Sequence, residues 1–189
     1  MKKVEFGKKA RTKLVEGIDI LADAVVSTLG PNGRNVFIQK GIVEPPQSTK
    51  DGVTVARSIV LKDPELEMGV QAMKYAAIKT ADKAGDGTTT STLLAREMVH
   101  AGLEGLNNGE NAVKIKRDID KSVKQVVSKL KDIAEDISDE SQLTQIATVS
   151  ANNDEEIGSL ISTGIEKVGP KGVVHIETSK TGETYIETV

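Results

Sequence analysis

The sequence contains no cysteine and no tryptophan, and it has only two phenylalanines and two tyrosines. Without cysteine, the chain can form neither a disulfide bond nor a thiolate metal site. Because aromatic side chains are so few, the core must be built from aliphatic residues, which pack well between helices. The stacking of nucleic-acid bases on aromatic rings is also nearly excluded. These absences favour a helical, aliphatic protein.

Long apolar runs and a strong charge of one sign are absent too. No uninterrupted apolar stretch approaches the roughly 20 residues of a membrane span, and residues 1–6 are not followed by the apolar core of a signal peptide. The formal net charge is −3, and lysine and glutamate are interspersed without the basic stripe that binds a phosphate backbone. We therefore expect a cytoplasmic protein without a membrane or nucleic-acid partner.

Apolar residues recur at helical spacing along most of the chain, and Asp, Pro and Gly stand where helices should begin or end. The pattern predicts helices over 9–29, 63–84, 89–106, 111–137, 140–149 and 154–168. Two short β-prone segments at 35–39 and 47–49 are expected to pair as a hairpin, and further strands are expected at 173–177 and 185–189. The predicted fold is mainly α, with a helical domain containing one small hairpin, followed by a small α+β segment.

Residues 85–90, Gly-Asp-Gly-Thr-Thr-Thr, lie between two predicted helices. Free N–H groups and the helix dipole favour an anion at a helix N-terminus, so this segment predicts a phosphate-binding loop. Asp86 would repel a phosphate unless a cation lay between them, and its oxygen ligands suit Mg²⁺. An ordinary turn with threonine caps is the alternative. No Walker A lysine follows, so Lys50 is the candidate phosphate contact.

Two other loops could contribute to the same site. Residues 28–35 form a glycine-rich corner at a helix end, where Gly30 and Gly33 allow close approach of a ligand to the backbone. Residues 49–56 place Lys50 and Asp51 at the mouth of another short helix. Taken singly, the first loop could be a helix-stop turn and the second an N-cap with a surface lysine.

Four motifs occur in a characteristic order and spacing: Thr-Leu-Gly-Pro-x-Gly-Arg-Asn from 28, Thr-Lys-Asp-Gly-Val-x-Val-Ala from 49, Ala-Gly-Asp-Gly-Thr-Thr-Thr-x-Thr from 84 and Ser-Ala-Asn from 150. In this set the chain resembles the N-terminal part of group I chaperonins, the bacterial and organellar Hsp60 class. The resemblance covers the whole chain. It implies an equatorial, nucleotide-binding domain over 1–134 and the first part of an intermediate, hinge-like domain over 135–189.

The resemblance also implies roles for individual residues. Asp51 would help position the attacking water, and Asp86 would bind Mg²⁺. The expected nucleotide-binding residues are Thr28, Leu29, Gly30, Pro31, Lys50, Asp86, Gly87, Thr88, Thr89 and Thr90. Phosphoryl transfer to water depends mainly on positioning and charge stabilisation, which these groups could supply.

The function implied by the resemblance is that of an ATP-dependent chaperonin that encloses non-native polypeptides and assists their folding. Its cofactors would be ATP and Mg²⁺, with K⁺ as a further candidate. Its partners would be identical subunits in a double ring of seven-fold symmetry, a co-chaperonin lid and non-native clients. In such a ring the hairpin would pair with a neighbour's strand at Lys3–Phe6.

Family members are much longer, and their second catalytic carboxylate lies outside the matching part. The 189 residues alone are therefore expected to be inactive. One alternative is a non-catalytic structural protein that keeps the ring scaffold. A small-molecule kinase using the same loop is the third hypothesis, although the sequence offers no obvious site for a phosphate acceptor.

Overall fold

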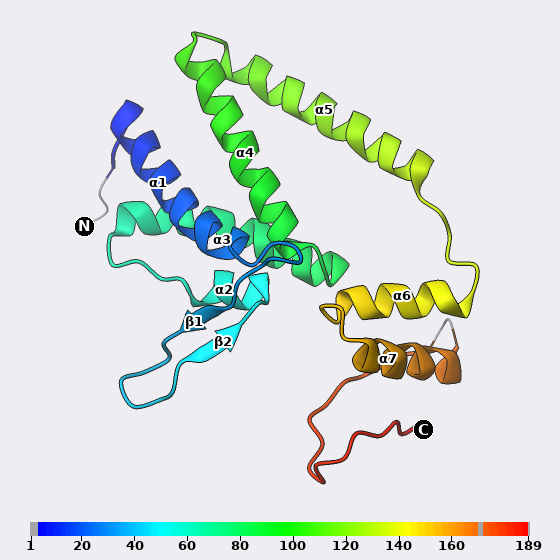
Figure 1. The fold of residues 1–189 in the computed structure, drawn as a ribbon. Helices are drawn as coiled ribbons and strands as arrows, with labels where there is room; N and C mark the ends of the chain where they lie inside the picture. The colour runs from blue at the N-terminus through cyan, green and yellow to red at the C-terminus, as the bar shows by residue number, and fades with distance from the viewer. Residues whose placement is uncertain (1–3, 170–171, 189) are drawn as a thin grey trace. The chain divides into compact units, whose positions relative to one another are not determined.

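The computed structural model describes residues 4–169 and 172–188, and Figure 1 shows their arrangement. The elements in these ranges are α1 (Gly7–Val26), β1 (Val36–Ile38), β2 (Gln47–Thr49), α2 (Gly52–Ser58), α3 (Pro64–Ala84), α4 (Thr88–Asn107), α5 (Ala112–Ile133), α6 (Glu140–Ser150) and α7 (Glu155–Val168). The prediction of a mainly helical fold with one small hairpin is confirmed. None of the helices in the described ranges is both long enough and apolar enough to cross a membrane.

The chain divides into two compact units, Met1–Val127 and Ser128–Val189. The boundary lies inside α5, a few residues before the expected domain boundary at 134. The candidate site belongs to the first unit, and the second unit is built around the helix pair α6 and α7.

Most helix ends lie where the sequence predicts them, because their caps are formed by nearby side chains and glycines. The Asp63 carboxylate accepts a hydrogen bond from the N–H of Glu65 at the start of α3, and Asp154 accepts one from Ile157 at the start of α7. Gly85 ends α3 in the left-handed conformation, with φ of 75°, which glycine adopts without a steric penalty.

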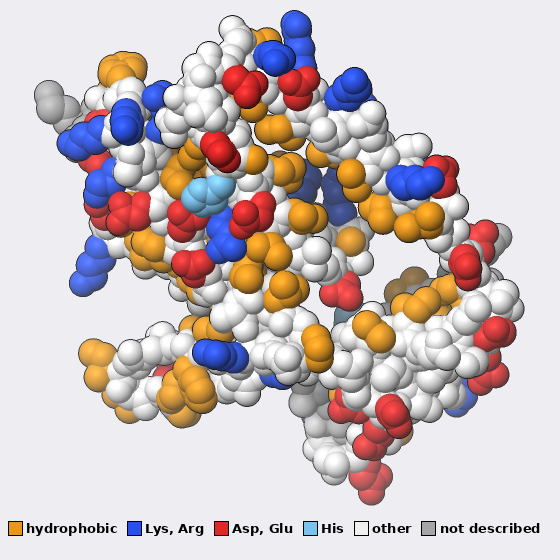
Figure 2. All heavy atoms as spheres, turned by 45° about the horizontal axis from the view of Figure 1, so that its top comes forward, with side chains coloured by type: hydrophobic (Ala, Val, Ile, Leu, Met, Phe, Trp, Pro, Cys, Tyr) orange, Lys and Arg blue, Asp and Glu red, His pale blue; other side chains and the backbone are white. Residues whose placement is uncertain are grey.

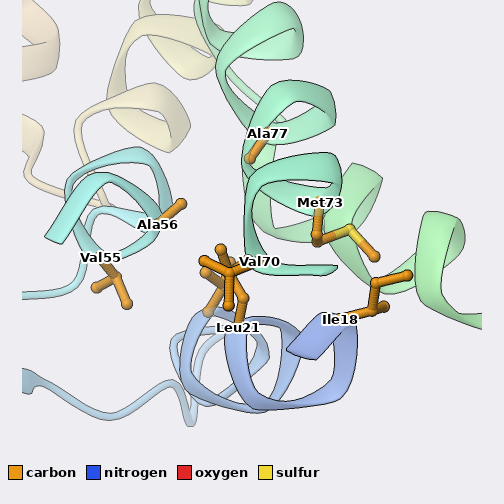
Figure 3. Close-up of a cluster of buried hydrophobic side chains, with 8 residues drawn as sticks. Ile18, Leu21, Val55, Ala56, Val70, Met73 and Ala77 are labelled. Carbon is orange, nitrogen blue, oxygen red and sulfur yellow. The ribbon is translucent and has the colours of Figure 1, made fainter. Parts of the chain in front are cut away.

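The core of the first unit is aliphatic, as the composition predicts. Figure 3 shows side chains of α1, α2 and α3 pointing toward one another. The cluster consists of Ile18, Leu21, Val25, Val55, Ala56, Val70, Met73 and Ala77. It packs α2 against both α1 and α3 and so fixes the short helix that follows the second motif loop.

The hairpin joins β1 and β2 as an antiparallel pair in which Val36 lies opposite Thr49 and Ile38 opposite Gln47. Its connecting segment projects from the helical body in Figure 1. At this end Ile42 is 98% exposed and Val43 is 95% exposed.

The strands expected at 173–177 and 185–189 do not form within the described residues. A strand needs a neighbouring strand to accept and donate its backbone hydrogen bonds, and the described part of the second unit offers none to these segments. Val189 itself lies outside the described residues.

Candidate functional site

The first, second and third motif loops meet at the N-terminus of α4. The hydroxyl oxygens of Thr28 and Thr89 lie 3.2 Å apart. Thr28 already donates its single hydroxyl hydrogen to the carbonyl oxygen of Val25 at 2.7 Å, so Thr89 is the donor in the pair. Residues 61 positions apart in the chain are thus joined by one hydrogen bond.

Gly52 brings the second loop into the same contact. A Cβ atom placed on Gly52 would lie 2.5 Å from the Thr89 hydroxyl oxygen and 3.4 Å from a methyl group of Val25. Real Cβ atoms essentially never approach another heavy atom to 2.5 Å. The backbone of α2 therefore lies close against the start of α4, and a larger residue at position 52 would have to displace the Thr89 hydroxyl.

The N-terminus of α4 has the features of an anion site. Gly87 is its N-cap, with φ of 82° and no capping side chain, and the hydrogen bond from Ser91 N–H to the Gly87 carbonyl, at 2.9 Å, begins the helical pattern. The N–H groups of residues 88–90 precede this bond, as expected for the first turn of a helix. Such groups, together with the helix dipole, favour a bound phosphate.

Asp86 is exposed and lies directly before this helix. One of its carboxylate oxygens accepts a hydrogen bond of 2.6 Å from the N–H of Gly87. Within residues 4–169 and 172–188, no group of three or more His, Asp or Glu side chains could hold a metal ion by itself. Mg²⁺ commonly binds through one or two carboxylates and the oxygens of a bound phosphate, and an exposed Asp86 beside an anion site fits that arrangement.

Asp51 is the N-cap of α2, so the alternative interpretation of this residue holds as a local description. Its carboxylate accepts hydrogen bonds from the N–H of Val53 at 3.3 Å and of Thr54 at 3.0 Å, and also one from the Thr54 hydroxyl. Each carboxylate oxygen can accept about two hydrogen bonds. Asp51 is therefore held in one orientation while Oδ1 keeps room to accept a bond from a water molecule.

The first loop closes as a tight turn. The N–H of Gly33 donates to the carbonyl of Gly30 at 2.9 Å, and Arg34 donates to Ser27 at 2.8 Å. Leu29, Gly30 and Pro31 lie exposed on this turn, and Lys50 is exposed beside Asp51. The contacts thus join Thr28, Gly52 and Thr89, while the other predicted site residues lie next to these three in the chain.

Two residues are missed by the sequence reasoning. Gly52 is part of a quoted motif but is not named as a contact, although a glycine directly after a capping aspartate is a usable signal. Lys74 is the second: it is 8% exposed, and its spacing within α3 places it on the buried face with Val70, Met73 and Ala77.

Comparison with known proteins gives two findings. The model of the TCP-1/cpn60 chaperonin family matches residues 21–187. Two crystal forms of the chaperonin gp146 from the bacteriophage EL 2 (Pseudomonas aeruginosa), both in the presence of ATP-BeFx, are similar in structure. Form II has a TM-score of 0.70 and 35% identity, with 82% of this chain and 27% of that chain covered.

Form I has a TM-score of 0.71 and 35% identity, with 83% of this chain and 28% of that chain covered. The chain therefore spans little more than a quarter of the length of the chaperonin that it matches.

Proposed function

The chain belongs to the TCP-1/cpn60 chaperonin family, and from this premise we propose that it is the nucleotide-binding portion of a group I chaperonin that hydrolyses ATP to assist protein folding. The observation that carries the proposal is the meeting of Thr28, Gly52 and Thr89 at the uncapped start of α4. We further propose that residues 1–134 form the equatorial domain and 135–189 the first part of the intermediate domain.

In this site the chain's own groups bind and orient the nucleotide. The N–H groups of residues 88–90 and the hydroxyls of Thr88 and Thr90 donate hydrogen bonds to phosphate oxygens, while the Thr89 hydroxyl keeps its bond to Thr28. Lys50 offsets the charge of the phosphates. Asp86 holds the Mg²⁺ that accompanies ATP, and Leu29, Gly30 and Pro31 line the nucleotide beside Thr28. The bound Mg–ATP supplies the phosphoryl group and the charge that polarises it.

Asp51 orients the attacking water through the free acceptor capacity of its carboxylate. Its hydrogen bonds to Val53 and Thr54 fix its direction before a water arrives. Phosphoryl transfer gains most of its rate from such positioning and from fixed charges. A carboxylate that is already held in place by a helix N-terminus suits this task.

The same proposal includes assembly into a ring of identical subunits, with a co-chaperonin lid and non-native polypeptides as partners. The hairpin β1–β2 has unpaired outer edges in the described chain, and Phe6 has the extended backbone of a strand, with φ of −132° and ψ of 164°. If the hairpin paired with residues 3–6 of a neighbouring subunit, the backbone N–H and C=O groups along the hairpin edge would gain hydrogen-bond partners. Lys3 lies outside the described residues.

The test is Mg²⁺-dependent ATP hydrolysis by the full-length natural protein, with particle mass measured in the same samples. Asp51→Asn is preferred to Asp51→Ala, because asparagine also caps a helix and removes only the charge. Asp139→Asn makes the same change at the N-cap of α6 and serves as the matched control. We expect Asp51→Asn and Asp86→Asn to lower kcat by about 100-fold or more, with the control unchanged.

Rings that form but never hydrolyse ATP would instead support a structural protein that has kept the scaffold and lost catalysis. Full activity of Asp51→Asn would remove Asp51 from the proposed chemistry.

A further inference from the structure

Lys74 is a buried lysine near the middle of α3, with 8% of its surface exposed. Its ammonium group donates a hydrogen bond of 2.6 Å to the carbonyl of Ile59 and a longer one of 3.4 Å to that of Arg57. Both carbonyls belong to the C-terminal end of α2, where Ile59 is the C-cap residue. A cation is favoured at this end of a helix, and burying it is costly unless such bonds are made.

Glu67 lies two helical turns before Lys74 on α3 and binds the next part of the same segment. Its carboxylate accepts a hydrogen bond of 2.7 Å from the N–H of Leu61. This N–H lowers the pKa of Glu67 most, followed by the side chain of Gln71 and, more weakly, by the charge of Lys74. Two side chains of α3 thus bind the backbone of residues 57–61: Lys74 binds carbonyl oxygens and Glu67 binds an N–H group.

This attachment controls a short helix that carries site residues at its other end. Helix α2 has seven residues, so its two ends are only about 10 Å apart. Its N-terminal end holds Asp51 by hydrogen bonds and sets Gly52 against Thr89. A shift of the C-terminal end would therefore move Asp51 relative to α4.

A stability argument alone does not explain a lysine at this position. Val70, Met73 and Ala77 line the same face of α3 and are buried in the core, where an apolar side chain would avoid the cost of burying a charge. What an apolar side chain could not do from this position is bind the carbonyl groups at the end of α2, as the ammonium of Lys74 does.

We propose that Lys74 is a positioning residue of the nucleotide site: by holding the C-terminal end of α2, it sets the place of Asp51 against the phosphate loop. This inference rests on the proposed function. It assigns to Lys74 no contact with the nucleotide or with the attacking water.

The first experiment measures kcat and KM for ATP hydrolysis by the full-length protein and by Lys74→Met, which keeps the length of the side chain and removes its charge. We expect kcat to fall about 10- to 100-fold, as a misplaced catalytic group predicts. KM should change several-fold less than kcat, since the N–H groups and threonines of the phosphate loop on α4 are untouched and Lys50 is the one proposed phosphate contact that would move with Asp51. Lys79→Met makes the same change at an exposed position of α3 and should leave both constants unaltered.

The second experiment combines Lys74→Met with Asp51→Asn. If Lys74 acts through Asp51, the double variant should be no slower than Asp51→Asn alone, because the water-orienting group is already lost. If Lys74→Met does not fold, Lys74→Gln replaces it in this double-mutant comparison, because glutamine keeps a shorter, neutral hydrogen-bond donor.

The outcomes separate this inference from the proposed function. A wild-type protein that does not hydrolyse ATP would defeat both. Two results with an active wild type would defeat only the positioning role and leave Lys74 as a structural residue. One is a normal kcat in the Lys74 variant. The other is a double variant whose fall in kcat equals the product of the two single falls.

Discussion

Gly52 is the residue at which the meeting of the loops can be tested by adding one methyl group. In Gly52→Ala the new Cβ would lie 2.5 Å from the Thr89 hydroxyl, so this hydroxyl must rotate away from Thr28 or the start of α4 must shift. Overpacking of this kind costs about 1–3 kcal/mol of unfolding free energy. We expect that loss in urea unfolding, together with at least about a tenfold weaker affinity for Mg–ATP in calorimetry.

Gly41→Ala is the control for this change, because a Cβ at Gly41 would meet only the flexible side chain of Glu44, at 3.9 Å. It should leave both stability and affinity unchanged. Unchanged binding of Mg–ATP by Gly52→Ala would show that the contact between Gly52 and Thr89 does not shape the site.

Asp63 predicts a pH dependence of stability. The N–H of Glu65 is the main cause that lowers the pKa of Asp63, followed by the ammonium of Lys13, which lies 3.1 Å from the carboxylate. A carboxyl group whose pKa is lower in the folded than in the unfolded state stabilises the fold above its unfolded pKa, and this contribution is lost as pH falls through the folded pKa.

The variant Asp63→Asn keeps a helix cap but loses the charge. We therefore expect it to unfold at lower urea concentration than wild type at pH 7, and the difference to disappear toward about pH 2. Asp82→Asn, in an exposed pair 3.9 Å from Arg57, should match wild type throughout. Parallel pH profiles of wild type and Asp63→Asn would contradict the assignment.

The predicted site residues differ in how much the sequence could say about them. The proposed anion site of residues 85–90 rests on a glycine-rich turn before a helix, which is a local signal, and α4 does begin at Thr88. The hydrogen bond between Thr28 and Thr89 depends on tertiary packing. The motifs alone do not predict it, and only the family resemblance suggests that their loops meet. The burial of Lys74 could not be predicted from the sequence, because a lysine in a helical pattern is normally exposed.

At the scale of elements, the helices were predictable because their end signals are local. Asp63 and Gly85 bound α3 where the sequence places its ends. The strands expected at 173–177 and 185–189 were wrong, since alternation reports only a tendency to extend and a strand also needs a partner. The hairpin could form because both of its strands lie within 14 residues of each other.

The crossing of α1 and α3 supplies a prediction about helix packing. A Cβ at Gly17 would lie 2.0 Å from the carbonyl oxygen of Leu66, and one at Gly69 would lie 2.0 Å from that of Leu14. Both obstacles are backbone atoms, which cannot rotate away as a side chain can. Gly17→Ala and Gly69→Ala should each lower the unfolding free energy by at least about 2 kcal/mol.

Gly102→Ala on α4 is the matched control, because its Cβ would meet a side-chain atom of Ile115 at an ordinary 3.7 Å. Alanine has the higher helix propensity, so this variant should be neutral or more stable by up to about 1 kcal/mol. Equal effects of all three substitutions in urea unfolding would show that the close crossing of α1 and α3 is not what glycine provides.

At the scale of the whole molecule, apolar surface remains uncovered in the described chain. Helix α5 has no buried residue, although it has apolar side chains along its length, and Val126, Leu130 and Ile133 are each more than half exposed. Soluble monomers seldom leave such surface open over large areas. The composition could predict an aliphatic core, but it could not show which apolar faces stay exposed among the residues that the structure describes.

The hairpin carries the last prediction, which concerns assembly. Phe37, Ile42 and Val43 are 71%, 98% and 95% exposed, and Figure 2 shows apolar side chains at the end of the projecting hairpin. Because these side chains stabilise nothing within the described chain, changing Ile42 and Val43 together to Asp should leave the unfolding free energy within about 0.5 kcal/mol of wild type.

If the hairpin end lies in the proposed ring interface of the full-length protein, two added charges there would have to be buried unpaired. We expect mass photometry to find rings of the wild type and mostly smaller particles of the double variant at the same concentration. Met68→Asp adds a charge at another exposed apolar position, on α3, and should still form rings. If the double variant forms rings as fully as wild type, the hairpin end lies outside the subunit interface, and assembly must depend on other surfaces, with the exposed face of α5 the next to be tested.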